Sequence, residues 1–362
     1  MKNNGIKVAV GLSGGVDSSV AAALLLEQGY DVIGITMEIY DDAVEMKEGD
    51  KHACFGPGEK EDVERASSIC ERLGIPFHTI DLKMEYRKYV INYFRDEYLK
   101  GRTPNPCVMC NNKLKFGFLL EKTKDAGVDF AFFGTGHYAK IRKSGERYLL
   151  QKAADHSKDQ TYFLYTLKPA QLSRILFPLG SFTKPKVREI ARSLGLETAE
   201  SPESQDFIAG NDYSILFNEK EISSGNIVDE AGNILGMHRG IIHYTIGQRK
   251  GLGIASDRPL YVSKIDAENN RIVVGNQENL FSIGLVTKTM NLLIVEELDK
   301  AYRVKAKIRL KHRGVDASIL PLSKNTAKIM FDEPQLSVTP GQSVVLYIDD
   351  TVFGGGIIER SL

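Results

Sequence analysis

The chain is poor in the residues that mark secreted or membrane proteins. It has four cysteines and no tryptophan among 362 residues. It also has no run of about 18 apolar residues that could span a membrane. The first residues, MKNNGIK, lack the apolar core of a signal peptide, so we expect a cytoplasmic protein with no membrane partner. The 47 basic residues equal the 47 acidic ones, so a nucleic acid would have to bind local basic patches.

The residues that are present indicate a globular protein, with 42% hydrophobic and 26% charged residues and a length typical of two or three domains. Apolar runs at 7–10, 32–37, 77–81 and 130–135 indicate strands. Stretches at 17–28, 60–74, 84–99, 112–126 and 184–195 indicate helices. This alternation predicts an α/β domain with a parallel sheet, helices on both faces and a ligand at the carboxyl ends of the strands.

The pattern changes after about residue 213. Short strands are expected at 241–245, 260–265, 271–274, 302–308, 326–331 and 343–348, separated by Gly, Asn, Asp and Pro turns. Such spacing predicts small β-barrels. We therefore expect three domains: residues 1–210, a central β domain at 211–280 and a C-terminal β-barrel at 281–362.

A glycine-rich turn follows the first predicted strand, where residues 11–19 read GLSGGVDSS. A strand, a glycine turn and a helix start point backbone N–H groups and the positive end of the helix dipole at one place, which suits a phosphate. Asp17 supplies a carboxylate that can hold Mg²⁺. The turn lacks the lysine of the common phosphate-binding loop. The stretch SGGVDS instead resembles the signature of the ATP-pyrophosphatase (PP-loop) superfamily, which implies a Rossmann-like, adenine nucleotide α-hydrolase-like domain that transfers AMP to a substrate oxygen and releases pyrophosphate.

A second motif, TPNPCVMCN, spans residues 103–111 and pairs Cys107 with Cys110. A cysteine near a helix start has its thiolate favoured, which increases its nucleophilicity. Taken alone, the C-x-x-C spacing also fits half a zinc site or a redox pair. Cys70 falls on the apolar face of a predicted helix, so we expect it in the core.

Three further segments complete the pattern: GTGHYA at 134–139, KDQTYFL at 158–164 and HYTIGQRKGLG at 243–253. Together with the two motifs above, they make the chain similar to the bacterial tRNA-specific 2-thiouridylase (MnmA) family nearly from end to end. The resemblance implies an enzyme that adenylates the C2 oxygen of the wobble uridine and replaces it with sulfur. Its expected partners are tRNAs for Lys, Glu and Gln and a sulfur donor or persulfide relay protein, with ATP and Mg²⁺ as cofactors.

The resemblance also implies site residues, with Cys110 as the nucleophile. The implied ATP-binding residues are Gly11, Leu12, Ser13, Gly14, Gly15, Val16, Asp17, Ser18, Met37 and Gly136. The implied tRNA-binding residues are Asn105, Pro106, Cys107, His137, Lys158, Asp159, Gln160, Arg309, Leu310 and Gln342. The basic stretch around Arg309 suits phosphate contact, although a solvated strand face would look the same.

The chain departs from the family pattern at its second cysteine. Many members have Asp at the position of Cys107 and a further catalytic cysteine in a segment that here reads SPESQDFIAG, at 201–210. Aligned on Phe207, the missing cysteine becomes Asp206, and aligned from Ser204 it becomes Ile208. In both alignments the second thiol is missing. Two mechanisms could operate without that cysteine. In the first, Cys107 replaces the missing thiol and forms a disulfide with Cys110. In the other, Cys107, Cys110 and a third ligand hold a 4Fe–4S cluster. Cys54 is the expected third ligand and Asp206 a weaker candidate.

Two other functions compete with sulfur transfer. A PP-loop ligase or amidotransferase for a small metabolite would share the ATP loop, but it has no need for TPNPCVMCN or for two β domains. A catalytically degraded tRNA-binding homologue would explain the missing cysteine, but the intact loop with Asp17 opposes it.

Overall fold

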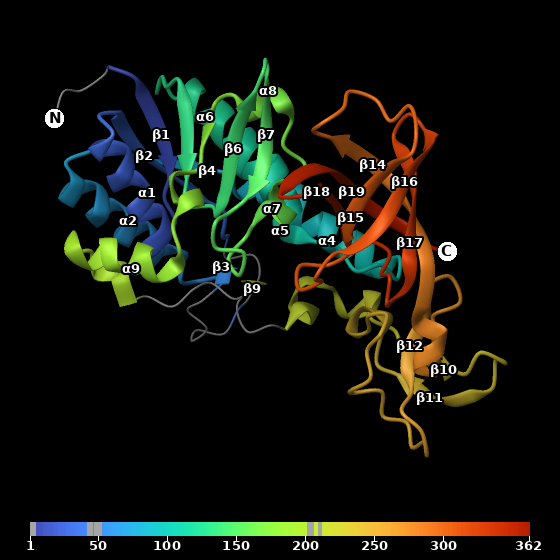
Figure 1. Ribbon diagram of the computed structural model, residues 1–362. Helices are drawn as coiled ribbons and strands as arrows, with labels where there is room; N and C mark the ends of the chain where they lie inside the picture. The colour runs from blue at the N-terminus through green and yellow to red at the C-terminus, as the bar shows by residue number, and fades with distance from the viewer. Residues whose placement is uncertain (1–4, 42–45, 47–52, 201–205, 209–211) are drawn as a thin grey trace. The chain divides into compact units, whose positions relative to one another are not determined.

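The computed structural model describes residues 5–41, 46, 53–200, 206–208 and 212–362 (Figure 1). The chain divides into two compact units. The first comprises Met1–Val90, Cys107–Asp212 and Asp350–Val352, and the second comprises Ile91–Pro106, Tyr213–Asp349 and Phe353–Leu362.

The first unit is built on a parallel sheet, as the alternation of strands and helices predicted. Its order is β4 (Phe77–Asp81), β2 (Asp31–Glu38), β1 (Lys7–Gly11), β5 (Phe132–Thr135) and β8 (Ile175–Leu176). All four neighbouring pairs run parallel. The chain builds outward from β1 to β2 and β4, then returns to place β5 on the other side of β1. A ligand crevice is expected at such a change of direction, outside the carboxyl end of β1.

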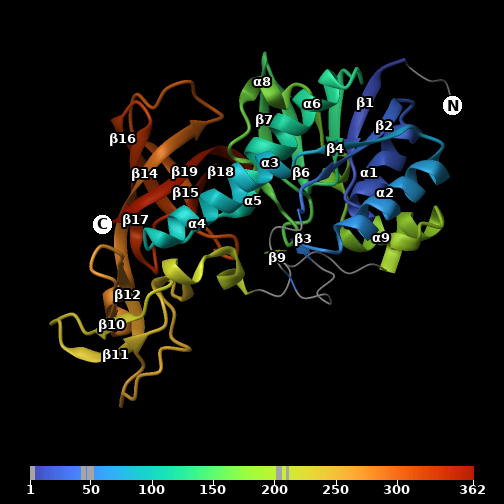
Figure 2. The ribbon, with the colours of Figure 1, turned by 180° about the vertical axis from the view of Figure 1, so that it is seen from behind.

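Helices cover this sheet because their apolar faces need a partner. Helices α1 (Val16–Glu27) and α2 (Glu59–Leu73) lie beside β2, as both views show (Figure 2). Helix α9 (Lys184–Ser193) packs on α1 through Val187 and Ala191. Cys70 of α2 is buried, and its sulfur fills the space that a Cβ on Gly34 would need. The prediction of a core role for Cys70 is confirmed.

Two predicted helices are interrupted by π-helical turns. The stretch expected at 84–99 consists of α3 (Lys83–Tyr86), the π-helix Arg87–Ile91 and α4 (Asn92–Leu99). The helix expected at 112–126 begins earlier, as α5 (Pro106–Met109), the π-helix Cys110–Phe118 and α6 (Leu119–Asp125). Apolar periodicity does not distinguish a π-helix from an α-helix over so few residues, and π-turns occur often at functional sites.

A hairpin of β6 (Ala139–Ser144) and β7 (Arg147–Lys152) was not predicted, because its polar residues hide the alternation expected of a strand. Shorter elements follow it. These are α7 (Thr161–Leu164), α8 (Pro169–Leu172), the 3₁₀ turns Pro178–Ser181 and Glu197–Glu200, and β9 (Asp206–Ile208). Strand β9 pairs in parallel with β3 (Ala53–Phe55).

The second unit contains two β structures. The 3₁₀ turns Tyr213–Leu216 and Glu219–Glu221 lead into a sheet of β11 (Ile234–His238), β10 (Gly225–Val228), β13 (Arg271–Gly275) and β12 (Tyr261–Asp266). The strand expected at 241–245 is wrong, because Ile241–His243 is a 3₁₀ turn. Ile241 and Ile242 are both buried, and a strand would turn consecutive side chains to opposite faces.

After the 3₁₀ turn Gln277–Leu280, the chain forms a closed barrel. Its strands follow the order β14 (Phe281–Leu292), β17 (Thr326–Leu336), β16 (Val315–Ser323), β15 (Tyr302–Lys307), β18 (Ser343–Ile348) and β19 (Thr351–Ser361). Pairing of β14 with β19 closes the ring. Leu285, Ile329 and Phe353 are fully buried in its core. The fold class predicted from the sequence, a parallel-sheet domain followed by β domains, is confirmed.

Candidate active site

The glycine-rich turn forms a cradle at the start of α1. Gly14 has φ of +68°, and a Cβ there would lie 2.5 Å from the Asp62 carbonyl oxygen, so only glycine fits. The Ser18 and Ser19 hydroxyls donate to the Gly15 carbonyl at 3.1 and 2.8 Å, which holds the turn closed. The first N–H groups of a helix have no acceptor within it. The cradle therefore suits an anion, as the sequence predicted.

Two other strands reach the same place. A Cβ on Gly136, directly after β5, would lie 2.7 Å from the backbone of Asp17 and Ser18, so these segments are in close contact. On the other side of β1, the Thr36 hydroxyl donates to the Leu12 carbonyl at 2.8 Å, next to Met37. The structure thus gathers the predicted ATP-binding positions around the carboxyl end of β1.

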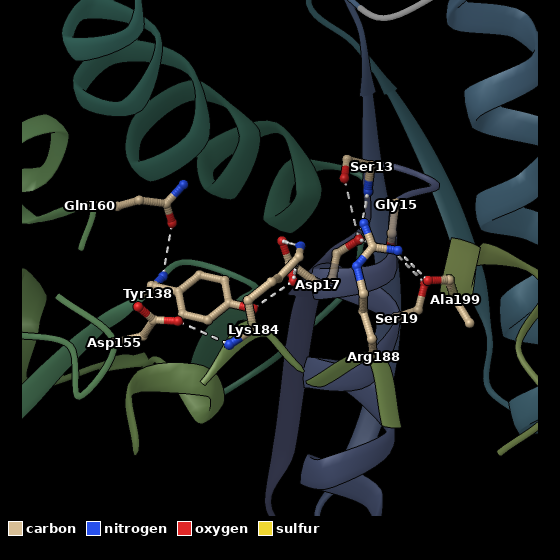
Figure 3. A network of polar contacts seen from close by, with 11 residues as sticks. Ser13, Gly15, Asp17, Ser19, Tyr138, Asp155, Gln160, Lys184, Arg188 and Ala199 are labelled. Carbon is tan, nitrogen blue, oxygen red and sulfur yellow. Dashed lines mark hydrogen bonds and ion pairs between the residues drawn. The ribbon is translucent and has the colours of Figure 1, made fainter. Parts of the chain in front are cut away.

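Asp17 lies at the centre of a polar network (Figure 3). The Tyr138 hydroxyl donates to Asp17 Oδ1 at 2.8 Å. Lys184 Nζ donates to both carboxylate oxygens, at 2.8 and 2.7 Å. The Asp17 side chain stays 30% exposed, whereas that of Lys184 is only 8% exposed. Asp17 is therefore held in place and still open to a ligand.

The KDQ segment is tied to this network. The Tyr138 N–H donates to Gln160 Oε1 at 2.8 Å, and the Gln160 N–H donates to the Tyr138 carbonyl at 2.9 Å. Asp159 is buried and accepts from the Ala153 N–H and the Thr161 hydroxyl. Gln160 thus holds the loop at 158–160 against Tyr138, and Asp159 ties the same loop to Ala153 and Thr161. Lys158 is half-buried beside them.

His137 also lies at this edge of the sheet. Its Nδ1 is 2.9 Å from the Thr135 hydroxyl oxygen, and its ring packs edge-on to Phe177. Burial, helped by the nearby Lys115 ammonium, holds the pKa of His137 well below its usual range. At neutral pH the ring is uncharged, so it offers a hydrogen bond rather than a positive charge to a ligand.

The thiols come from two segments. Cys107 lies in α5, and Cys110 begins the following π-helix, with the Asn111 amide donating to the Cys107 carbonyl at 3.0 Å. Cys54 is exposed on β3, where Ala53 pairs with Asp206. Strand β9 is therefore the neighbour of the strand that carries Cys54.

The buried side chain of Tyr86 lies in the same neighbourhood as these thiols. Tyr86 stacks on Phe55 with ring centroids 5.2 Å apart. Its pKa is raised well above the usual value, first by burial and then by Cys110, Cys54 and Cys107. Cys110, Cys54 and Cys107 therefore lie near enough to Tyr86 to affect its pKa. Within the described parts of the chain, no three His, Cys, Asp or Glu side chains are grouped so as to hold a single metal ion.

The expectation of a stabilised Cys110 thiolate is wrong. Burial raises the pKa of Cys110 to about 11, and Cys54 adds to the rise, while the Lys115 ammonium opposes it. Cys110 begins the π-helix that follows α5 and so lies away from the helix start. The helix dipole therefore stabilises its thiolate only weakly. At neutral pH it is a protonated thiol.

The second unit holds the remaining predicted tRNA-binding positions. Gln342 donates to the carbonyls of Thr103 and Pro104, at 3.2 Å each, and so holds the approach to Asn105 and Pro106. Arg309 is exposed and donates to the Leu336 carbonyl at 3.1 Å, and Leu310 beside it is 41% exposed.

Three residues at the site, Lys184, Tyr138 and Glu59, were not predicted from the sequence. Lys184 opens an ordinary amphipathic helix, and Tyr138 lay inside a quoted motif without a role. Glu59 begins α2, and its carboxylate accepts the Ile39 and Tyr40 N–H groups at 2.8 and 3.1 Å. Burial raises the pKa of Glu59 to about 7, against the lowering effect of those two hydrogen bonds. No pattern in the sequence predicts the contacts of Lys184 and Tyr138 with Asp17, or those of Glu59 with the backbone after β2.

Comparison with known proteins agrees with this geometry. Residues 6–209 match the family model described as "tRNA methyl transferase HUP domain". Residues 214–276 match "tRNA methyl transferase PRC-barrel domain", and 282–358 match "Aminomethyltransferase beta-barrel domain". A tRNA-specific 2-thiouridylase MnmA of Acetivibrio thermocellus is 50% identical, covering 98% of this chain and 99% of the relative. This chain belongs to the MnmA family. The MnmA proteins of Clostridium perfringens (45% identical) and Thermoanaerobacter sp. (MnmA 2, 48%) match over 98% of the chain and at least 98% of their own length.

These comparisons confirm the resemblance seen in the five motifs. The described helices include none that is long and apolar enough to cross a membrane.

Proposed function

We propose that this MnmA-family chain is a tRNA-uridine 2-sulfurtransferase. It uses ATP to adenylate the C2 oxygen of the wobble uridine and then replaces that oxygen with sulfur, releasing AMP and pyrophosphate. The observation that carries the proposal is the anion cradle at 11–19 in a chain that matches named 2-thiouridylases over almost its full length.

The division of labour follows the predicted domains. Residues 1–210 bind ATP and carry the chemistry, 211–280 form a central β domain, and the β-barrel at 281–362 contacts tRNA. The ATP ligands are Gly11–Ser18, Met37 and Gly136. The tRNA ligands are Asn105, Pro106, Cys107, His137, Lys158, Asp159, Gln160, Arg309, Leu310 and Gln342. The proposed substrates are tRNAs of the Lys, Glu and Gln type, and the proposed location is the cytoplasm.

Adenylation solves a leaving-group problem. A uracil carbonyl oxygen departs poorly, whereas an oxygen bonded to AMP departs as part of a stable phosphate monoester. The cradle N–H groups and the α1 dipole hold the phosphates, and the open carboxylate of Asp17 fits the oxygen ligands that Mg²⁺ prefers. Bound Mg²⁺ would neutralise phosphate charge. The protein residues position the nucleotide for attack by the uracil oxygen.

Sulfur delivery runs through Cys110. In the first route, a persulfide on Cys110 attacks C2 and AMP leaves with the oxygen. Cys107 then attacks the sulfur of Cys110, which leaves the transferred sulfur on the base and a Cys107–Cys110 disulfide. A thiol reductant must reopen that disulfide before the next cycle. A persulfide relay protein or a small sulfur donor loads Cys110.

The second route uses an iron–sulfur cluster. The chemistry of the donors fits, because cysteine thiolates are the usual ligands of such clusters. Cys54, Cys107 and Cys110 all lie near enough to Tyr86 to raise its pKa, but the described side chains would have to move closer together to bind one metal group. Cys54, Cys107 and Cys110 would hold it, and the cluster would supply an iron able to carry sulfide. Asp206, opposite Ala53 on β9, is an alternative ligand from the neighbouring strand.

ATP-dependent incorporation of radioactive sulfur into tRNA tests the function. The wild type is compared with Cys110→Ala and with Cys70→Ala, a matched change of a core thiol. We expect incorporation to be lost in the first variant and kept in the second. Full incorporation by Cys110→Ala would remove Cys110 from the chemistry, and no incorporation by the wild type with its donor system would favour a small-metabolite ligase. Anaerobic purification with iron and sulfide analysis separates the two routes.

A further inference from the structure

The nucleotide cradle lacks a cation of its own. Residues 11–19 include no lysine or arginine, although the common phosphate-binding loop carries a lysine that reaches the phosphates. ATP brings several negative charges to this place, and Asp17 adds another. A cation at the cradle would have to come from elsewhere in the fold.

The first unit supplies one from α9. Lys184 lies 167 positions after Asp17 in the chain, and its Nζ bridges both oxygens of that carboxylate. The backbone N–H of Lys184 donates to Asp155 Oδ2 at 3.0 Å, which fixes the start of α9 beside the cradle (Figure 3). Nζ also lies 5.9 Å from the centroid of the Tyr138 ring. The ammonium is therefore almost enclosed, with its charge directed at the cradle.

Asp17 does not need this lysine. A carboxylate in the first turn of a helix is already stabilised by the dipole, and Asp17 accepts the Tyr138 hydroxyl as well. Burying an ammonium costs desolvation energy, which nearby negative charge must offset. The nearly enclosed Lys184 ammonium lies at the start of α1, beside a glycine loop that has no cation of its own, where the phosphates of a bound nucleotide would arrive.

We propose that Lys184 is a phosphate ligand of ATP, resting on Asp17 while the site is empty and binding the β- or γ-phosphate when the nucleotide enters. This inference rests on the proposed function. Asp17 is released from the ammonium when the phosphates arrive, so its oxygens become available to Mg²⁺. Lys184 thus supplies the cation that the glycine loop lacks. AMP, with its single phosphate, does not reach Lys184.

Isothermal titration with ATP and with AMP, in the presence of Mg²⁺, tests this assignment. Lys184→Met keeps most of the apolar stem and removes the charge. We expect ATP to bind roughly ten- to hundred-fold more weakly, because a charge-assisted hydrogen bond is lost, and AMP to bind within about two-fold of the wild type. Lys184→Arg restores most of the ATP affinity. Lys186→Ala, an exposed lysine of the same helix that pairs with Glu189, is the matched control and leaves both affinities unchanged.

Each other outcome has a distinct meaning. Unchanged ATP affinity in Lys184→Met overturns the inference and leaves the proposed function intact. Equal weakening of ATP and AMP overturns it too, because that pattern indicates a purely structural role. If the wild type binds no ATP, the proposed function itself fails. Circular dichroism checks folding, and Lys184→Gln replaces the methionine variant in the same titrations if that variant is unfolded.

Discussion

Replacing Glu59 with glutamine should change how the stability of the protein depends on pH. Burial raises the pKa of Glu59 from 4.5 to about 7 in the folded chain. Between these values the folded protein binds a proton that the unfolded chain does not. Stability from this group is therefore complete below about pH 4.5 and is lost as the pH rises through about 7.

The size of the effect follows from the shift. Each pKa unit is worth about 1.4 kcal/mol, which sets an upper limit of about 3 kcal/mol. Glu59 is partly exposed, and solvent screening reduces the figure to about 1–2 kcal/mol. The glutamine side chain of the variant would keep a carbonyl oxygen for the Ile39 N–H and carry no charge. Glu59→Gln should thus gain about 1–2 kcal/mol over the wild type on going from pH 5 to pH 8.

Urea denaturation followed by circular dichroism at the two pH values measures this difference. Glu61→Gln, an exposed change in the same first turn of α2, is the control and should follow the wild type. If Glu59→Gln loses as much stability between pH 5 and pH 8 as the wild type does, burial does not raise the pKa of Glu59.

Three further predictions concern the site and the core. Gly136→Ala should weaken ATP binding at least about ten-fold in titration calorimetry, since its Cβ would meet the backbone of Asp17 and Ser18, whereas Gly236→Ala, which has ordinary room, should not. Tyr138→Phe should weaken Mg²⁺-dependent ATP binding by about three- to ten-fold through loss of one hydrogen bond to Asp17, and an unchanged affinity would show that this bond does not position the carboxylate. Cys70→Ala should lower the free energy of unfolding by about 1–2 kcal/mol in urea and keep sulfur incorporation; loss of activity in the folded variant would contradict its core role.

Much of the first unit could be predicted because its signals are local. The strand at 77–81 matches β4 at both ends, and α2 starts and ends one residue before the predicted helix. Apolar runs bounded by turn residues determine such elements with little help from the rest of the chain. The cradle belongs to the same class, since a strand, a glycine turn and a helix are contiguous in sequence.

The errors occurred where local signals conflict with packing. The run at 241–245 is apolar enough for a strand, yet Ile241 and Ile242 are buried together in a 3₁₀ turn. For Cys110, proximity to a helix start predicted a favoured thiolate, whereas its burial raises the pKa to about 11. The magnitude of burial cannot be read from neighbours in sequence, because distant segments produce it.

By itself, then, the amino-acid sequence determined the fold class, the anion cradle and the family, because the signals for each are short motifs or periodic segments, within which the residues are close together along the chain. Only the tertiary structure decided which charges meet. Lys184 reaches Asp17 because α9 packs on α1, and Tyr138 reaches it because β5 lies beside β1. Cys54, on β3, likewise lies near enough to Cys110 to raise its pKa, although no periodicity in the sequence relates the two positions.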